Sequence, residues 1–221
     1  MHKEDFSWLT FYNYRLKVRK QFPSVWCIKV RKKHQQIVLK ELADGNSILD
    51  VGAGERYLPS KLKRLNPAKR IAYKSMDIDK TQKHDYYSLD EIQEKFDMIT
   101  FLEVIEHMQF SDGMKTLKKF RELLKPSGKL VISTPNIHHP SVFFWDSNHV
   151  TPYRYDVLGA ALLINGFKIR NIYRIYNDQF LRRFLRIYIM YRLHRYLDVD
   201  FARQILAVAQ LQEGNGKESI C

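Results

Sequence analysis

Four residues that could transfer a proton or bind a metal ion lie in two short segments. Glu103, Glu106 and His107 occur in the run LEVIEH, and His149 occurs in SNHVTPY. Positions i, i+3 and i+4 share one face of a helical turn, so we expect the first three side chains to point the same way. A carboxylate beside an imidazole can act in acid–base chemistry or hold a divalent ion. The pattern predicts a site that removes a proton from an acceptor atom.

A glycine turn earlier in the chain suits the close approach of a ligand to the backbone. Residues 48–51 form an apolar run that ends in Asp50 and continues as the turn Gly52-Ala53-Gly54. Glycine lacks a Cβ and tolerates positive φ, so a ligand can come close to the main chain there. We therefore expect a strand followed by a binding turn.

An acidic residue follows the next expected strand, in the run YKSMDID. A carboxylate at the carboxyl end of a strand in an open α/β sheet can accept two hydrogen bonds from the vicinal hydroxyls of a ribose. Asp77 is the better placed acceptor, with Asp79 as the alternative because strand ends are uncertain by a few residues. The two runs together predict a nucleoside site.

The glycine spacing separates two classes of nucleoside-binding protein. Dinucleotide-dependent dehydrogenases carry G-x-G-x-x-G beneath a diphosphate. This chain reads D-x-G-x-G, followed in order by LEVIEH, LLKPSGKLVISTPN and NGF. The set resembles class I S-adenosylmethionine-dependent methyltransferases, in particular small-molecule O-methyltransferases, over about residues 47–173. Arg56 stands where that family usually has a third glycine.

The resemblance implies S-adenosylmethionine as cofactor and assigns residues to each part of it. The glycine turn would surround the methionine portion, and the acid after the second strand would hold the ribose. Asp85 or Leu89 would border the adenine. The full expected cofactor set is Asp50, Gly52, Ala53, Gly54, Asp77, Ile78, Asp85, Leu102 and Glu103.

The resemblance leaves two catalytic arrangements open. In small-molecule O-methyltransferases the E-x-x-E-H turn supports the cofactor and a histidine is the base, which here implies His149, His107 and Glu106. In small-RNA 2′-O-methyltransferases a similar cluster holds a divalent ion, and quinone-pathway O-methyltransferases are a further candidate for this arrangement. That alternative would use Glu103, Glu106, His107 and His149. We expect the metal-free arrangement, because ligand spacing alone is a weak signal.

The elements that position these residues predict an α/β fold. Strands are expected at residues 98–102, 129–134 and 204–209, with a further strand beginning at Phe167. Apolar residues at helical spacing predict a helix before Pro126, and residues 156–164 predict another. The predicted architecture is a doubly wound, mostly parallel, seven-stranded Rossmann-like sheet. An N-terminal helical cap and a helical insertion before the last strand complete it.

Length and composition fit one domain in a reducing compartment. The chain has 221 residues and two cysteines, too few for a disulfide framework. It contains no apolar run long enough to span a bilayer and no signal-peptide core near Met1. We expect residues 46–210 to form the methyltransferase domain, residues 211–221 to be a disordered tail, and the protein to be cytoplasmic.

Positive charge is concentrated in two flanking segments. The net charge of +13 divides into +6 over residues 1–45, +2 over 46–167, +7 over 168–197 and −2 over 198–221. Residues 178–197 mix arginines with aromatic side chains and predict one basic helix over 179–197. Such flanks could be solvated faces, could form a substrate lid, or could bind an anionic partner such as RNA or a membrane surface.

Three functions follow from these observations. The first is O-methylation of a small-molecule, sugar or lipid-linked acceptor. The second is RNA 2′-O-methylation with a divalent metal, which the basic charge favours although no RNA-stacking motif is recognisable. The third is a catalytically silent module that binds S-adenosylmethionine, which only Arg56 favours.

Overall fold

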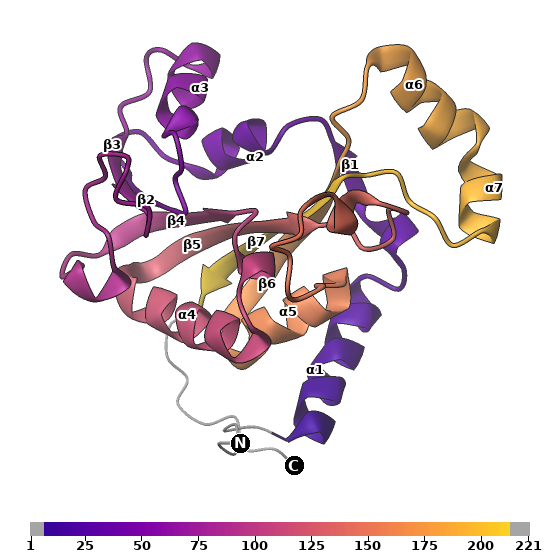
Figure 1. Ribbon diagram of the computed structural model, residues 1–221, viewed down its shortest axis with the longest axis horizontal. Helices are drawn as coiled ribbons and strands as arrows, with labels where there is room; N and C mark the ends of the chain where they lie inside the picture. Colours follow the sequence, from indigo (N-terminus) through magenta and orange to yellow (C-terminus); the bar gives the residue numbers. More distant parts are fainter. Residues whose placement is uncertain (1–6, 213–221) are drawn as a thin grey trace.

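The computed structural model of the protein describes residues 7–212 (Figure 1). Within this range seven strands form one sheet in the order β1-β6-β7-β5-β4-β2-β3. All neighbouring strands are parallel except those of β7, which runs against both β5 and β6. The predicted doubly wound, mostly parallel sheet is therefore confirmed. The strands are β1 (Lys29–Arg31), β2 (Ser47–Val51), β3 (Ala72–Met76), β4 (Phe96–Leu102), β5 (Leu124–Pro135), β6 (Phe167–Ile175) and β7 (Gln204–Leu211).

Helices cover both faces of the sheet (Figure 1). One face carries α1 (Trp8–Gln21), α4 (Phe110–Leu123) and α5 (Tyr155–Ile164), and the other carries α2 (His34–Glu41) and α3 (Tyr57–Leu65). Successive strand residues point to opposite faces. Ile48 and Leu49 are both fully buried, one in each core. A strand buried on both sides reads as a continuous apolar run, which is why residues 48–51 gave a clear signal.

The seventh strand is one to which the sequence analysis assigned no residues. A short N-terminal strand, β1, pairs with β6 at one edge. At the opposite edge, beyond β3, the chain makes only an isolated bridge between Met76 and Tyr86. The Asp85 carboxylate accepts a hydrogen bond from the Ser75 backbone N–H at 2.9 Å. A further strand that paired with β3 would need the Ser75 N–H for its own backbone hydrogen bonds. Because Asp85 already accepts a hydrogen bond from this N–H, the segment after β3 forms a loop and not a strand.

Two flanking segments also differ from expectation. The N-terminal segment, predicted as a helical cap, contributes β1 as well as α1 and α2, so it is part of the sheet and of both layers. The predicted helix over 179–197 is instead α6 (Phe180–Phe184), a π-helical turn (Leu185–Ile189) and α7 (Tyr191–Tyr196). β-Branched and aromatic residues at 187–189 weaken a regular helix there.

Two further expectations concern the ends and the membrane. Most of the tail predicted over 211–221 lies outside the described residues, and β7 runs to Leu211. Among residues 7–212, no helix has the length and apolar character needed to cross a bilayer.

One edge of the sheet gathers the segments with functional residues. The carboxyl ends of β2, β3, β4, β5 and β6 share this edge because these strands are parallel in the sheet. Ile175 and Pro135, the last residues of β6 and β5, both pair with Gln204 at the start of β7. The insertion between β6 and β7 therefore also leaves and re-enters the sheet at this edge, where open α/β sheets bind ligands.

Candidate active site

The turn after β2 uses its two glycines in different ways. Gly52 has φ 71°, and a Cβ there would lie 2.3 Å from Val104 Cγ2, so this glycine allows the turn to pack against the segment after β4. Gly54 has φ 49°, and a Cβ there would meet open space. Between them, Ala53 donates its backbone N–H to the Met76 carbonyl at 3.2 Å. The open position at Gly54 leaves room for a ligand against the main chain.

Asp77 and the glycine turn meet directly. The Gly54 N–H donates to Asp77 Oδ2 at 2.8 Å, and the Asp79 N–H donates to Asp77 Oδ1 at 3.0 Å. Each carboxylate oxygen keeps a further lone pair for a ribose hydroxyl. Asp79 instead accepts a hydrogen bond from the Thr81 N–H within its own turn. Next to Asp77, the Ile78 side chain is 81% exposed and offers an apolar surface for a ring.

Asp50 and Asp85 hold strands together rather than facing an open crevice. The buried Asp50 carboxylate accepts hydrogen bonds from the Tyr73 hydroxyl at 2.9 Å and the Thr100 hydroxyl at 2.6 Å. Burial raises the pKa of Asp50. Asp85 is occupied by the backbone and hydroxyl of Ser75. Asp50 thus links β2 to its neighbours β3 and β4, and Asp85 fixes the loop after β3 to that strand.

Two other members of the expected cofactor set also lie at this edge. Leu102, the last residue of β4, is half-buried and packs against the α2–α3 core. Glu103 follows with φ 56°, and its Oε1 accepts a hydrogen bond from the Ser133 hydroxyl at 2.7 Å.

Arg56 adopts the backbone conformation that a glycine would favour. Its φ is 56°, in the left-handed region, immediately before α3. Its guanidinium donates to the Lys83 carbonyl at 3.1 Å and lies 3.6 Å from Asp85. The side chain is thus turned onto the segment after β3, and the arginine costs about 1 kcal/mol of local strain.

The second set of predicted residues forms a compact cluster. Glu106, His107 and His149 each place one potential ligand atom within 4.8 Å of the others. Glu106 and His107 belong to a 3₁₀ turn after β4 (Ile105–His107). The Glu106 carbonyl accepts hydrogen bonds from the N–H groups of Val150 and Thr151, at 2.8 and 3.0 Å. These bonds hold the loop that carries His149 against the turn.

Both histidines are oriented by backbone carbonyls. His107 Nδ1 lies 3.2 Å from the Asn148 carbonyl, and His149 Nδ1 lies 2.6 Å from the Phe143 carbonyl. A carbonyl oxygen only accepts, so each Nδ1 carries the hydrogen and each Nε2 of the neutral ring carries a lone pair. His149 Nε2 lies 4.0 Å from Glu106 Oε1. The lone pair of this ring and the carboxylate therefore serve one small site.

Glu103 stands apart from this cluster, which corrects two expectations. Its left-handed backbone lies outside the 3₁₀ turn, so the i, i+3 and i+4 spacing with Glu106 and His107 does not apply. The structure thus brings together three of the four residues of the metal alternative. Burial raises the pKa of both Glu103 and Glu106, and the negative charge of Glu103 raises that of Glu106 further.

Glu106 has a carboxyl group that the protein leaves unsatisfied. The residue is fully buried, and neither oxygen has a hydrogen-bond partner within residues 7–212. Two neighbouring hydroxyls, Thr134 Oγ1 and Tyr153 Oη, are buried and equally without a partner there. A buried polar group without a partner is costly in either protonation state. A divalent ion on Glu106, His107 and His149 would satisfy the carboxylate, and histidines that donate Nδ1–H to carbonyls are typical metal ligands. The residues fit such an ion.

Comparisons with known proteins identify the family. A family model described as "Methyltransferase domain" matches residues 12–186, which is most of the chain. The chain belongs to this methyltransferase family. The prediction made from D-x-G-x-G and the motifs after it is confirmed, and S-adenosylmethionine is the cofactor of the family.

Individual relatives are distant. The methyltransferase is 28% identical over 152 residues to "Ubiquinone biosynthesis O-methyltransferase" of Coxiella burnetii, a match that covers 62% of this chain and 58% of the relative. The chain therefore spans less than two thirds of the length of that curated relative. A SAM-dependent methyltransferase from Archaeoglobus fulgidus has a TM-score of 0.59 at 15% identity, with 90% of this chain and 94% of that chain covered. The N-methyltransferase NodS from Bradyrhizobium japonicum, in complex with S-adenosyl-L-homocysteine, gives 0.54 at 14% identity, with coverage of 81% and 86%.

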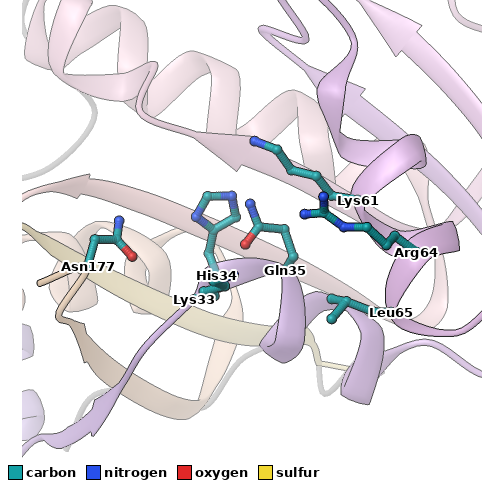
Figure 2. A pocket seen from close by; sticks show the side chains of 7 residues that line it. All are labelled: Lys33, His34, Gln35, Lys61, Arg64, Leu65 and Asn177. Atoms are coloured by element: carbon teal, nitrogen blue, oxygen red, sulfur yellow. The ribbon is translucent and has the colours of Figure 1, made fainter. Parts of the chain in front are cut away.

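A basic cavity of about 280 Å³ lies beside α2 and α3 of the methyltransferase (Figure 2). Its lining is Lys33, His34, Gln35, Lys61, Arg64, Leu65 and Asn177. Figure 2 shows the heads of His34, Gln35, Lys61 and Arg64 gathered on one side and Asn177 approaching from the other. Burial and the nearby Lys61 lower the pKa of His34 to about 4. This lining would take an anionic group, and the spacing of its residues in the sequence gave no signal for it.

Several residues at the site were not found by sequence reasoning. Val104 fills the space at Gly52, Ser133 binds Glu103, and Tyr153 reaches the neighbourhood of Glu106. They come from separate segments, and none occurs in a spacing that marks chemistry. Only the folded sheet edge brings them together.

Proposed function

We propose that this methyltransferase transfers the methyl group of S-adenosylmethionine to a hydroxyl of a small-molecule acceptor. The observation that carries the proposal is the position of Glu106, His107 and His149 at the same sheet edge as the contact between Gly54 and Asp77. A cofactor site and a proton-removing site adjoin there. An oxygen acceptor needs both, because it must lose a proton as it gains the methyl group.

The cofactor supplies an activated methyl group, so the protein needs no covalent intermediate. Its task is to hold the acceptor oxygen in line with the transferred carbon, which can provide most of the lowering of the barrier. Asp77 and the turn at Gly54 are proposed to hold the ribose and the backbone-facing part of the cofactor. The half-buried Leu102 is the last residue of β4, four residues before Glu106 in the chain.

The acceptor proton is proposed to leave through the cluster. His149 presents Nε2 with its lone pair, because Nδ1–H is used on the Phe143 carbonyl. The unsatisfied Glu106 carboxyl supports a cation at the same place, held by Glu106, His107 and His149. A divalent ion bound there would lower the pKa of a nearby hydroxyl. The unsatisfied carboxyl favours this arrangement over the metal-free one that we expected from the sequence.

The relatives differ in what they indicate about the acceptor atom. The Coxiella burnetii relative is named an O-methyltransferase, which favours an oxygen acceptor. NodS is an N-methyltransferase on the same fold, and a likeness of fold does not fix the acceptor. RNA 2′-O-methylation and a silent binding module stay predictions from the sequence. Arg56, the residue that favoured a silent module, directs its guanidinium to Lys83 and Asp85 and not into the glycine turn.

Calorimetry tests the cofactor site. We expect S-adenosylmethionine and S-adenosylhomocysteine to bind, and Asp77→Asn to weaken both by about 1–3 kcal/mol because a charge-assisted bond to the ribose is lost. The control is Asp79→Asn, whose carboxylate is used within its own turn and which should bind as wild type. Wild-type affinity in Asp77→Asn with a loss in Asp79→Asn would transfer the ribose contact to Asp79.

Transfer of a labelled methyl group tests the acceptor. A panel of hydroxylated aromatic and lipid-like small molecules is compared with matched amines, and products are identified by mass spectrometry. The proposal expects O-methylated products that require Glu106 and His149. Methylation of the amines alone, or of RNA alone, would contradict it.

A further inference from the structure

We propose that the insertion between β6 and β7, together with the loop at residues 142–145, is a docking surface for an anionic lipid bilayer. The insertion comprises α6, the π-helical turn and α7, and it projects to one side of the sheet, away from the helices of both layers (Figure 1).

Large apolar side chains cover the outer surface of the insertion. Phe180, Tyr188 and Ile189 are 73%, 70% and 64% exposed, and Tyr196 is 86% exposed. A soluble surface seldom carries so many apolar side chains in one place, and a contiguous patch of this kind marks an interaction site. The other exposed apolar members of the insertion are Leu181, Phe184, Leu185, Met190, Leu193 and Leu197.

Arginines alternate with these apolar residues. Residues 180–197 contain five arginines and no acidic residue. Arg182, Arg183 and Arg192 form no ion pair with any acidic residue of the described chain. Short helical segments with apolar side chains and arginines side by side fit the interface of an anionic membrane, where the apolar groups enter the lipid and the guanidinium groups stay at the headgroups.

The base of the insertion is held to the rest of the fold by several contacts, so its exposed surface has a defined structure. Arg186 binds Asp178 at 2.6 Å and lies over the Phe201 ring at 4.1 Å. His194, buried in α7, contacts the same ring with centroids 4.8 Å apart. Asp200 then fixes the return to the sheet by accepting hydrogen bonds from Arg174, Tyr176 and Asn136.

The surface continues to the proposed proton-removing cluster. Phe201 contacts His139, and His139 contacts Trp145, with ring centroids 5.5 and 5.7 Å apart. Trp145 and its neighbour Phe144 are 59% and 81% exposed. Phe143, in the same loop, contacts the His149 ring at 5.2 Å. A docked bilayer would therefore lie next to the site that removes the acceptor proton.

A bilayer fits this surface better than RNA or a second copy of the chain. Most of the exposed apolar members of the insertion are aliphatic, and aliphatic side chains gain nothing from phosphates or stacked bases. A second copy would carry the same positive charge on the same surface, and the two would repel. Lipid supplies both the apolar phase and the negative charge.

Flotation with vesicles tests the proposal on the full chain without any methyl acceptor. Phosphatidylcholine vesicles are compared with vesicles that also contain phosphatidylglycerol, at low and high salt. We expect wild-type protein to float with the anionic vesicles. Phe180→Ser/Tyr188→Ser/Ile189→Ser should lower the bound fraction at least about tenfold, because three apolar side chains no longer enter the lipid.

Two further variants test whether binding is specific to the insertion and whether the arginines contribute to it. Trp8→Ser/Leu9→Ser removes two side chains of similar exposure from α1, on a different part of the molecule, and should float as wild type. Arg182→Gln/Arg183→Gln should lose the preference for phosphatidylglycerol and much of the salt dependence. Binding of S-adenosylmethionine should be unchanged in every variant, which shows that the fold and the cofactor site are intact and keeps this test separate from the proposed reaction.

Four results would overturn the inference. The first is no flotation of wild-type protein with either vesicle, and the second is flotation of the triple serine variant equal to wild type. The third is a concentration-dependent dimer that the triple variant abolishes, which would assign the surface to a second copy. The fourth is salt-sensitive binding to polyuridine that outcompetes the anionic vesicles, which would assign it to nucleic acid.

Discussion

Two carboxyl groups of this methyltransferase are equally buried but have opposite electrostatic surroundings. Asp156, in the first turn of α5, and Glu106, after β4, both have no exposed surface. Asp156 is surrounded by the guanidinium groups of Arg154, Arg19 and Arg15, at 2.6, 2.7 and 3.1 Å. These partners hold its pKa at about 2 despite the burial. Glu106 has no such partner among the described residues, and burial raises its pKa.

The difference separates a structural role from a functional one. Asp156 joins α5 to α1, since Arg15 and Arg19 both come from α1. Removing one partner of a buried ion pair is strongly destabilising, so the packing of α1 against α5 depends on this carboxylate. Glu106 contributes nothing of this kind and lies at the ligand-binding edge beside two histidines. An unpaired buried carboxyl in such a place supports the proposed role of Glu106 in the proton-removing cluster.

The largest expected effect is on activity, in Glu106→Gln. The amide keeps the size of the side chain but loses the charge that would bind a cation or work with His149. We expect the rate of methyl transfer to fall about 10²–10⁴-fold, in the range for loss of an acid–base or charge-stabilising group. The thermal midpoint should change little, because burial raises the pKa of Glu106 to about 9 and the carboxyl that the amide replaces is largely uncharged at neutral pH.

The control for this variant is Glu122→Gln, an exposed glutamate of α4 near Lys119. It should keep both activity and stability. Full activity in Glu106→Gln would remove the contrast between the two buried carboxyls, because both would then be structural.

The next effect is on stability, in Asp156→Asn. Three arginines would lose their common partner while still facing a buried site, and breaking a buried ion pair costs about 3–5 kcal/mol of unfolding free energy. Methyl transfer per folded molecule should stay close to wild type. Urea unfolding measures the change, and Asp112→Asn, which breaks an exposed pair with Lys115, should have little effect. A stable but inactive Asp156→Asn would contradict the division of roles.

The effect of a divalent ion on the stability of the folded protein tests the difference between Glu106 and Asp156 without an activity measurement. If Glu106 is unpaired because it binds a cation, Mn²⁺ or Mg²⁺ should stabilise the folded protein, by about 2.7 kcal/mol at a hundred times the dissociation constant. His149→Ala should abolish the gain and Asp156→Asn should keep it, as read from thermal midpoints with and without EDTA. An equal gain in His149→Ala would place the ion elsewhere.

The sequence predicted which residues of the candidate site lie together, for identifiable reasons. Asp77 was expected beside the turn at Gly54 because strand ends and glycine turns leave a local pattern, and Glu106, His107 and His149 were grouped because acid–histidine spacing does. The separation of Glu103 was missed, since its positive φ does not follow from residue type. The strand β1 was missed because three polar-flanked residues carry no periodicity and are ordered only by pairing with β6. Two of the three arginines around Asp156, Arg15 and Arg19, lie more than 130 positions away in α1, beyond any local pattern.

The smallest expected effect is in the pH dependence of stability, where the two carboxyls should again differ. The pKa of Asp156 in the folded protein, about 2, lies below its unfolded value near 3.8. A depressed pKa contributes stability that is present above the unfolded value and lost as the pH falls toward the folded value. About 2 kcal/mol should therefore disappear between pH 4 and about 2, at 1.36 kcal/mol for each unit of pKa difference. Urea unfolding at several pH values should show this loss in wild type and in Glu106→Gln, because a carboxyl with a raised pKa contributes nothing that acid removes. Asp156→Asn should lack it, and parallel curves for wild type and Asp156→Asn would mean that the arginines do not hold the folded-state pKa of Asp156 below its unfolded value.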